Sequence, residues 1–280
     1  MKTYAIGDVH GCLDTLDQLL SQLPEKCRLL FIGDIVNRGP KSLETIRAVM
    51  RMGERANCLL GNHELHLLAV YAGARVMSYE DTIDGILNAP DCDEIIQWLR
   101  TRPLACTDHG FLCVHAATHW SWSVKETLEQ AARVEKFLRS DKDFPHIGEL
   151  FGKQQWEDRL KGYDRLRAIV NVLTRTRYLN SDGSMDFKQK LSPRDTPVDY
   201  TPWFKFPHRK TAKTPVTFGH WSTLGAVVDV PNVFPLDTAC LWGGSLSALR
   251  LGKHNEYIRI KAPIYRIPGE KKLSGSCSLG

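Results

Sequence analysis

Residues 3–11, TYAIGDVHG, begin with an apolar run and end in a turn that carries an aspartate and a histidine. The same order returns in RLLFIGDIVNRG at 28–39 and in NCLLGNHE at 57–64. Helical spacing follows each segment, and this alternation predicts strand–helix–strand units around a parallel sheet. The carboxyl ends of such strands share the edge where α/β sheets bind ligands. The polar residues at these turns are Asp8, His10, Asp34, Asn37, Arg38, Asn62 and His63.

The second half of the chain has a different pattern. Apolar residues at helical spacing predict helices over 124–138 and 164–177. The stretch 180–215 is rich in Pro, Ser, Asp and Lys and is predicted to be a long surface loop. Short apolar runs separated by turn residues follow it and predict a second, largely antiparallel sheet. These runs are VTFGHW, GAVVDV, VFPLDT, LSALRL and EYIRIK.

The patterns together predict a single α/β (α+β) domain over residues 1–265. The segment at about 120–215 interrupts the strands, and we expect it to form a mostly helical insertion with loops that covers the site. The chain ends in KKLSGSCSLG, so residues 266–280 are expected to be a flexible C-terminal tail.

The composition is that of an ordinary globular protein, with 42% hydrophobic and 25% charged residues among 280. No apolar run reaches the length of about eighteen residues that a membrane helix needs, and the N-terminal sequence is a strand pattern rather than a secretion signal. We therefore expect a cytoplasmic protein. The eight cysteines lack CxxC spacing, which excludes a zinc ribbon and predicts buried free thiols.

Positive charge is concentrated in residues 151–215. This segment holds fourteen Lys or Arg against seven Asp or Glu, whereas the whole chain has a formal net charge of +5. An anionic substrate would be attracted to it. The alternative is a solvated surface on which the charges cluster by chance.

Two later histidines complete a set of candidate ligands. His115 in CVHAA and His220 in FGHW each follow an apolar, strand-like run. Taken singly, an aspartate at a strand end is usually a helix cap, and a histidine beside an apolar run is usually a core residue. The ordered series GD-x-HG, GD-x(3)-RG and GNHE is too long to arise by accident. Six ligands from five strand ends can enclose two cations.

These motifs resemble the calcineurin-like metallophosphoesterases, and in particular their phosphoprotein-phosphatase branch, with its GDxHG, GDxVDRG and GNHE signatures. Four further segments are similar to one family of that branch, the bacterial symmetrical bis(5'-nucleosyl)-tetraphosphatases. They are GNHELHLLAVYAG, LRAIVNVLTRTRY, FGHWSTLG and LDTACLWGGSLSALRL. The resemblance extends from Lys2 to about Tyr257. It implies a β-sandwich of two mixed sheets flanked by helices, with an insertion over the site.

The resemblance implies a site for two divalent metal ions. A bridging carboxylate holds two cations about 3.5 to 4 Å apart. Mixed imidazole and oxygen ligation favours Mn or Co, with Fe or Zn as alternatives. The implied ligands are Asp8 and His10 on the first ion, Asp34 between the two, and Asn62, His115 and His220 on the second.

The same resemblance implies roles for the residues around the ions. His63 would be the general acid for the leaving group, and Arg38 would bind phosphate through bidentate hydrogen bonds. Arg175 and Arg177 are expected to form a second phosphate clamp, with a structural salt bridge as the alternative for one of them.

Tryptophan side chains are candidates for stacking an adenine base. Trp120 and Trp203 are the better candidates, with core packing as the alternative. Trp221 and Trp242 adjoin predicted strands and are expected to pack in the core.

Asn37 departs from the phosphatase pattern, which has aspartate in GDxVDRG. An aspartate would raise the pKa of the catalytic histidine by its charge, whereas asparagine can only orient the ring, so His63 is expected to be a weaker acid. A nucleoside diphosphate needs less protonation to leave than a serine alkoxide does. Asn37 therefore favours cleavage of anhydrides over hydrolysis of phosphoserine.

The leading hypothesis is hydrolysis of dinucleoside polyphosphates. By the resemblance, a metal-bound hydroxide attacks an inner phosphorus of diadenosine tetraphosphate and two ADP are released. Removal of nucleoside-polyphosphate caps from RNA 5' ends is a further implied activity. The alternatives are a protein serine/threonine phosphatase, which shares the ligands, and a nucleotide- or RNA-binding regulator without turnover. No obligate protein partner is evident.

Overall fold

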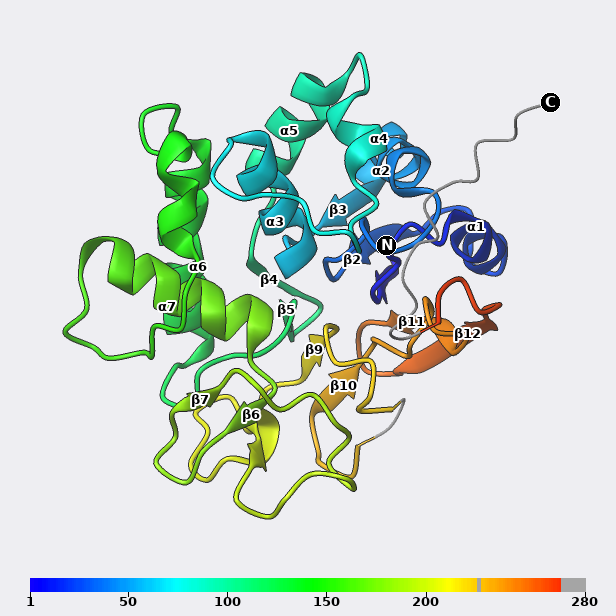
Figure 1. Ribbon diagram of the computed structural model, residues 1–280. Helices are drawn as coiled ribbons and strands as arrows, with labels where there is room; N and C mark the ends of the chain where they lie inside the picture. The colour runs from blue at the N-terminus through cyan, green and yellow to red at the C-terminus, as the bar shows by residue number, and fades with distance from the viewer. Residues whose placement is uncertain (226–227, 268–280) are drawn as a thin grey trace.

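The computed structural model describes residues 1–225 and 228–267. Two mixed β-sheets lie face to face and helices surround them (Figure 1). A small core cluster joins the sheets, with Ala5, Leu30 and Leu249 from the first sheet against Phe111 and Cys113 from the second. The expected sandwich of two mixed sheets flanked by helices is confirmed.

The first sheet has five strands in the order β12-β11-β1-β2-β3. Strands β1, β2 and β3 are parallel, whereas β11 pairs antiparallel with β1 and β12 pairs antiparallel with β11. All four residues of β1 are buried, as expected of a strand covered on both faces. The strand bounds are β1 Thr3–Ile6, β2 Arg28–Phe31, β3 Ala56–Cys58, β11 Ser245–Arg250 and β12 Glu256–Lys261.

The second sheet has the order β10-β9-β5-β4. Strand β4 is antiparallel to β5, but β5, β9 and β10 run parallel. Our prediction of a separate, largely antiparallel C-terminal sheet is therefore wrong, because the late strands divide between both sheets. Of the predicted strand GAVVDV, residues 226–227 lie outside the described residues and 228–230 form no strand. The bounds are β4 Ala105–Asp108, β5 Phe111–Val114, β9 Val216–Phe218 and β10 Val233–Pro235.

Helices follow the parallel strands as the sequence pattern predicts. The longest begins with a capping box, in which Ser123 Oγ accepts from Glu126 N at 3.2 Å and the Glu126 carboxylate accepts from Ser123 N at 2.7 Å. The helix bounds are α1 Leu13–Ser21, α2 Ser42–Arg51, η1 Gly53–Arg55, α3 Asn62–Tyr71, α4 Asp84–Leu87, α5 Cys92–Arg100, α6 Val124–Arg139, η2 Phe144–Leu150 and α7 Gly162–Arg175.

The segment between α6 and β9 contains more regular structure than its sequence pattern suggests. Helix α7 ends at Arg175, two residues earlier than predicted, so Arg177 lies outside it. A three-stranded sheet, β7-β6-β8, replaces part of the predicted loop. Each of its strands has two residues, too few for periodicity to reveal. The bounds are β6 Tyr178–Leu179, β7 Met185–Asp186, β8 Thr201–Pro202 and η3 Trp203–Lys205.

Part of the expected tail is tied to the body of the protein. Arg266 donates a hydrogen bond to the carbonyl of Glu80 at 2.7 Å, and its backbone N–H donates to Leu241 O at 3.2 Å. The rest of the predicted tail, 268–280, lies outside the described residues. All seven cysteines in the described ranges are free, as predicted. Within those same ranges no helix is long and apolar enough to cross a membrane.

Candidate active site

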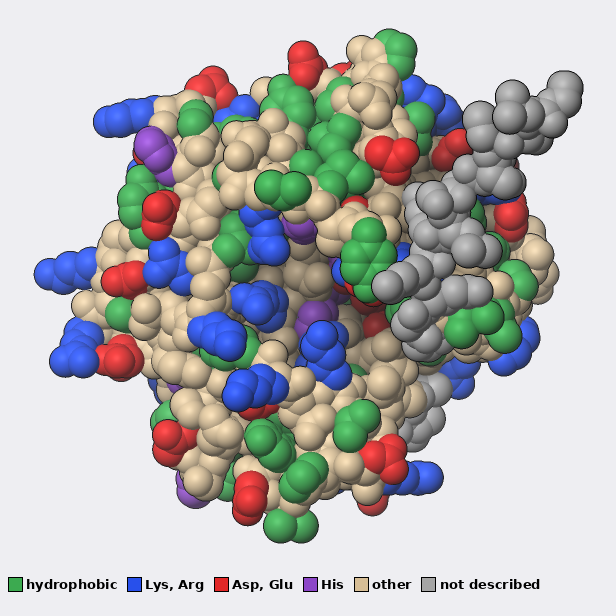
Figure 2. Space-filling view, in the orientation of Figure 1, with side chains coloured by type: hydrophobic (Ala, Val, Ile, Leu, Met, Phe, Trp, Pro, Cys, Tyr) green, Lys and Arg blue, Asp and Glu red, His purple; other side chains and the backbone are tan. Residues whose placement is uncertain are grey.

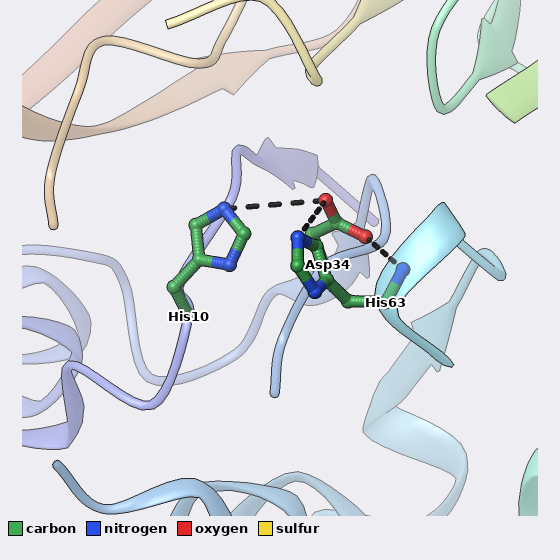
Figure 3. A group of neighbouring side chains, drawn as sticks. All are labelled: His10, Asp34 and His63. Carbon is green, nitrogen blue, oxygen red and sulfur yellow. Dashed lines mark hydrogen bonds and ion pairs between the residues drawn. The ribbon is translucent and has the colours of Figure 1, made fainter. Parts of the chain in front are cut away.

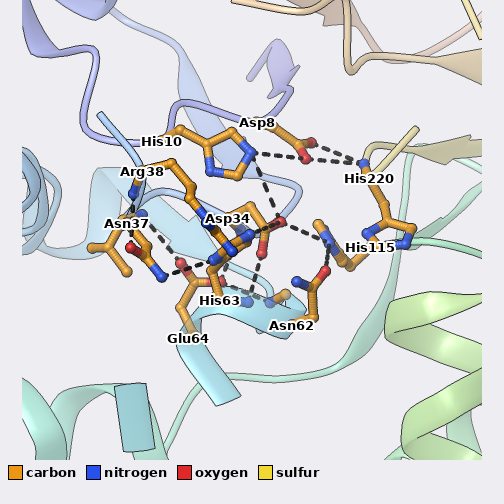
Figure 4. Close-up of polar contacts among 12 residues, drawn as sticks. Asp8, His10, Asp34, Asn37, Arg38, Asn62, His63, Glu64, His115 and His220 are labelled. Atoms are coloured by element: carbon orange, nitrogen blue, oxygen red, sulfur yellow. Dashed lines mark hydrogen bonds and ion pairs between the residues drawn. The ribbon is translucent and has the colours of Figure 1, made fainter. Parts of the chain in front are cut away.

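Five turns from both sheets converge on one point (Figure 4). Asp8 follows β1, Asp34 follows β2, and Asn62 opens α3 shortly after β3. From the second sheet, His115 follows β5 and His220 follows β9. Because β1, β2 and β3 are parallel, as are β5 and β9, their carboxyl ends meet where the sheets adjoin. All six predicted ligands, with His10 in the first turn, are brought together there.

Glu64 joins two of these turns. Its buried carboxylate accepts hydrogen bonds from Asp34 N at 2.8 Å, Ile35 N at 2.9 Å and Gly61 N at 2.9 Å. A side chain at Gly61 would overlap the Asp34 carboxylate. The glycine therefore permits the close approach of the second and third turns.

The backbone around the site adopts a conformation that side chains disfavour. Positive φ angles occur at His10 (50°), Asp34 (50°), Asn37 (74°), Arg38 (75°) and His220 (65°). Non-glycine residues in this region cost of order 1 kcal/mol or more each and concentrate at functional sites. Five such residues at one point indicate a site that the fold holds in place against local strain.

Two groups of side chains could each hold a cation, and they share Asp34. Figure 3 shows the imidazoles of His10 and His63 beside the Asp34 carboxylate, with Nε2 atoms 4.0 Å and 3.9 Å from Oδ2. On the other side, His115 Nε2 lies 3.3 Å from the same oxygen and 3.2 Å from Asn62 Oδ1. Asp8 Oδ2 is 3.8 Å from His10 Nε2. The Asp34 carboxylate therefore lies between the two groups.

The histidines present lone pairs to this centre. His115 Nδ1 donates to Ile32 O at 2.7 Å, which leaves Nε2 as the acceptor that faces Asp34. The backbone carbonyl of Arg175 likewise accepts from His220 Nε2 at 3.2 Å, leaving Nδ1 as the acceptor. Such outer hydrogen bonds fix the tautomer of metal-binding histidines. His10 Nδ1 is buried without a partner among the described residues.

Buried carboxyl groups give the centre an excess of negative charge. Asp8, Asp34 and Asp237 are 2%, 2% and 5% exposed. Burial, together with Asp237 and Asp34, raises the pKa of Asp8 well above its ordinary value. Buried like charges are costly unless cations oppose them, so this donor set fits divalent metal ions.

Asn37 is held in one orientation by four hydrogen bonds. Its Oδ1 accepts from the backbone N–H groups of Arg38 at 2.8 Å and Thr82 at 2.9 Å. Its Nδ2 must therefore donate, to Asp81 Oδ1 at 2.9 Å and to His63 Nδ1 at 3.0 Å. A ring whose Nδ1 accepts carries its proton on Nε2. Burial lowers the pKa of His63 to about 3, in keeping with a neutral ring.

Comparison with known proteins identifies the family. The model of the calcineurin-like phosphoesterase family matches residues 1–172. The symmetrical bis(5'-nucleosyl)-tetraphosphatase of Janthinobacterium sp. (strain Marseille) is 45% identical over 275 residues, which cover 96% of this chain and 100% of the relative. That of Ralstonia nicotianae is 47% identical over 252 residues, covering 89% and 88%. This chain belongs to the symmetrical bis(5'-nucleosyl)-tetraphosphatase family.

Solved structures share the fold of this tetraphosphatase-family chain. A crystal structure described provisionally as a diadenosine tetraphosphatase has a TM-score of 0.61 at 21% identity and covers 93% of each chain. A serine/threonine phosphatase from Saccharomyces cerevisiae has a TM-score of 0.56 at 14% identity, covering 97% of this chain and 82% of its own. The calcineurin-like family implies divalent metal ions, and the two ligand groups supply side chains to hold them.

Basic side chains gather around a hollow beside the tetraphosphatase-family ligand set (Figure 2). Arg38 lies there in an ion pair with Glu80. Arg175 Nη1 donates to Gly152 O at 2.9 Å, and Arg177 Nη2 donates to His220 O at 2.8 Å. Within the described chain neither Arg175 nor Arg177 forms a salt bridge, so that alternative is wrong. Both line a cavity next to the ligands.

The tryptophans lie differently from our expectation. Trp203 is 1% exposed and packs edge-on against Phe218, with ring centroids 5.2 Å apart, so it has no face to offer a base and that prediction is wrong. Trp120 is half-buried and packs against Phe206 at 5.4 Å, away from the two cavities of this tetraphosphatase-family site. Trp242, expected in the core, is half-buried and lines one of these cavities.

Sequence reasoning missed four residues of the tetraphosphatase-family site. Asp81 accepts from His66 Nε2 at 2.8 Å as well as from Asn37, but no motif marks it. Asp237 could have been found from LDTAC, an aspartate directly after a strand-like run. Lys190 and Phe187 come from the stretch that was predicted to be loop. Three of the four line the cavities beside the ligands: Asp237, Lys190 and Phe187.

A wider, open depression lies at the opposite edge of the first sheet and is not this tetraphosphatase-family site. Its volume is about 1260 Å³, and Arg28 and Ala56, the first residues of β2 and β3, line it. The predicted ligands all lie at the carboxyl ends of the strands instead. Geometry and chemistry therefore point to the smaller cavities.

Proposed function

We propose that this chain hydrolyses dinucleoside tetraphosphates symmetrically, converting diadenosine tetraphosphate to two ADP. Curated relatives at 42–47% identity bear this activity in their names. The observation that carries the chemistry is the position of Asp34, whose carboxylate lies between two pairs of imidazole side chains. A shared carboxylate of this kind suits a two-metal phosphohydrolase.

Two divalent cations would be held by the six ligands. When bound, they would neutralise phosphate oxygens and lower the pKa of a water molecule. The mixture of imidazole, carboxylate and amide ligands favours Mn or Co, with Fe or Zn as alternatives. The ligands are Asp8, His10 and Asp34 for one ion, and Asp34, Asn62, His115 and His220 for the other.

Side chains around the ligands bind and orient the substrate. Arg177 and Lys190 line both cavities and would hold phosphates beyond the attacked phosphorus. Arg38 would exchange the carboxylate of Glu80 for a phosphate, because guanidinium binds both groups through paired hydrogen bonds.

His63 would face the leaving-group oxygen. Because Asn37 donates to its Nδ1, the ring offers an Nε2–H hydrogen bond and stays neutral. That assistance suffices for a nucleoside diphosphate, whose terminal phosphate has a second pKa of about 6. A serine alkoxide would need a full proton, so the contact argues against a protein serine/threonine phosphatase.

The same chemistry extends to nucleoside-polyphosphate caps on RNA 5' ends, whose anhydride chain offers the same kind of leaving group. The basic residues of 151–215, three of which line the cavity beside the ligands, would favour either anion. Retention of the complete ligand set argues against a regulator without turnover.

Incubation with Mn or Co and diadenosine tetraphosphate, followed by anion-exchange chromatography, tests the proposal. ADP as the single product supports symmetrical cleavage. AMP with ATP would mean that the substrate binds off-centre. Dephosphorylation of a phosphoserine peptide without turnover of the dinucleotide would favour the protein phosphatase.

A further inference from the structure

We infer that the site has two nucleoside subsites, one in each of two cavities that share the centre of the site, with Phe187 as the base platform of one and Trp242 as that of the other. The inference rests on the proposed function and deepens it. It names where the two bases of a dinucleotide bind.

Two cavities of about 290 Å³ and 310 Å³ lie beside the ligands. Each also has walls of its own: the first reaches Phe187 just after β7, and the second reaches Trp242 in the turn after β10. The cleft therefore has a common centre and two arms. The residues that line both cavities are Arg38, Asn62, His63, Arg177, Lys190 and His220.

The first arm contains a stacked pair. The guanidinium carbon of Arg175 lies 5.4 Å from the centroid of the half-buried Phe187 ring. Arg175 is itself anchored, because Nη1 donates to Gly152 O and to Asn171 Oδ1, both at 2.9 Å. Aromatic rings and arginine planes are the surfaces on which proteins stack bases. The pair is fixed in place before any ligand arrives.

The second arm is closed by a turn of defined structure. Trp242 donates its backbone N–H to Ala239 O at 3.0 Å and forms a β-bridge with Ile264. Its side chain is half-buried: it packs against the edge of the core and also lines the cavity. An indole at the wall of a polar cavity offers a large flat face to a purine.

This arrangement matches the substrate class. A dinucleoside tetraphosphate has two bases joined by one anionic chain, and the cleft has two aromatic walls joined by one basic, ligand-bearing centre. With one base in each arm, the phosphate chain would cross the shared centre, where the ligands Asn62 and His220 and the cations Arg177 and Lys190 line both cavities. The two arms would thus select molecules with a nucleoside at both ends.

Binding and kinetics of single variants test the subsites. Stacking of one base is worth roughly 5- to 150-fold in affinity. Phe187→Ala and Trp242→Ala are each expected to lower kcat/KM for diadenosine tetraphosphate by that range. The aromatic replacements Phe187→Tyr and Trp242→Phe should restore most of the loss, whereas Phe187→Leu, which keeps the volume, should not.

Trp98→Ala is the matched control, because Trp98 also carries an arginine over its ring, Arg102 at 4.8 Å, but lines the distant depression. It should leave kcat/KM unchanged.

Titration calorimetry with ADP on the Mn-loaded protein separates this inference from the proposed function. Two ADP should bind to the wild type, and in each alanine variant one of the two should bind roughly 5- to 150-fold more weakly, whether or not the dinucleotide is cleaved. A single ADP bound by the wild type, two equally tight ADP sites in the alanine variants, or equal losses in the alanine and aromatic variants, would overturn the inference. Two ADP bound without turnover of the dinucleotide would instead contradict the proposed function alone.

Discussion

Exchanging the side chains of Asn37 and Asp81 tests the hydrogen-bond arrangement that holds His63. In Asn37→Asp, two carboxylate oxygens would face each other across the 2.9 Å that now separates Asn37 Nδ2 from Asp81 Oδ1. In Asp81→Asn, two amide donors would face each other instead. In the double variant the charge moves from residue 81 to residue 37. The hydrogen bonds that residue 37 makes with residue 81 and with His63 can form again with their polarity reversed, while the surrounding backbone N–H groups still find acceptors.

The magnitudes decide how each variant responds. Two ionised carboxylates at that distance repel by about 6 kcal/mol at an effective dielectric constant of 20. Keeping one of them protonated at pH 7, with an unfolded pKa near 3.9, costs about 4 kcal/mol. Proton uptake is cheaper, so Asn37→Asp should lose up to about 4 kcal/mol of unfolding free energy at pH 7. The carboxyl pair in the folded Asn37→Asp variant binds a proton more tightly than the unfolded chain does, so this loss of unfolding free energy should shrink as the pH falls towards 4.

Asp81→Asn leaves buried donors unsatisfied and should lose about 1 to 3 kcal/mol. The double variant should return to within about 1 kcal/mol of the wild type, because no group is left unpaired. Urea unfolding of all four proteins at pH 7, followed by circular dichroism, measures these differences.

The nitrogen NMR shifts of the His63 ring supply an independent reading. They should report an acceptor at Nδ1 in the wild type and a donor at Nδ1 in the double variant. If the double variant were no more stable than the weaker single variant, the assigned orientation of Asn37 would be refuted.

Three further predictions concern metal, acid and pH. Mn at 100 times its Kd should raise the unfolding free energy by about 2.7 kcal/mol for each bound ion; differential scanning calorimetry with and without chelator checks this, and an equal gain in Asp34→Asn would contradict it. His63→Ala should lose little kcat on p-nitrophenyl phosphate and more on poorer leaving groups, and an equal large loss on every substrate would sink the weak-acid argument. Burial among three tryptophans lowers the pKa of His119 to about 4. In the unfolded chain this histidine has a pKa near 6.5 and binds more protons than in the folded protein, so the unfolding free energy should fall by about 2 kcal/mol between pH 7 and 5. His119→Gln should lack that share of the loss in urea unfolding, and an unchanged pH dependence would contradict the shift.

The ligand set could be predicted because short sequence motifs encode it. Each ligand lies in a turn directly after a strand, and strands of alternating units meet at one edge. The residues that orient the side chains around those ligands are harder to find. Asp81 contacts Asn37 across 44 positions of sequence, and only the path of the chain between α3 and α4 brings them together.

Long-range packing also explains the errors in the insertion. Trp203 is buried because Phe218 from β9 and Phe204 pack against its ring, and neither contact leaves a periodic signal. The C-terminal strands likewise follow partners rather than neighbours in sequence: β11 pairs with β1, about 240 residues away. Periodicity identifies strands, but pairing is decided by which edges the rest of the fold leaves open.

Hydrolysis of diadenosine tetraphosphate in water labelled with a heavy oxygen isotope tests the central claim most directly. With Mn or Co bound, attack at an inner phosphorus predicts ADP as the only product, with the label solely on its terminal phosphate, and no reaction in Asp34→Asn. Label in AMP or in orthophosphate, or turnover that survives loss of the Asp34 carboxylate, would contradict symmetrical cleavage at this centre.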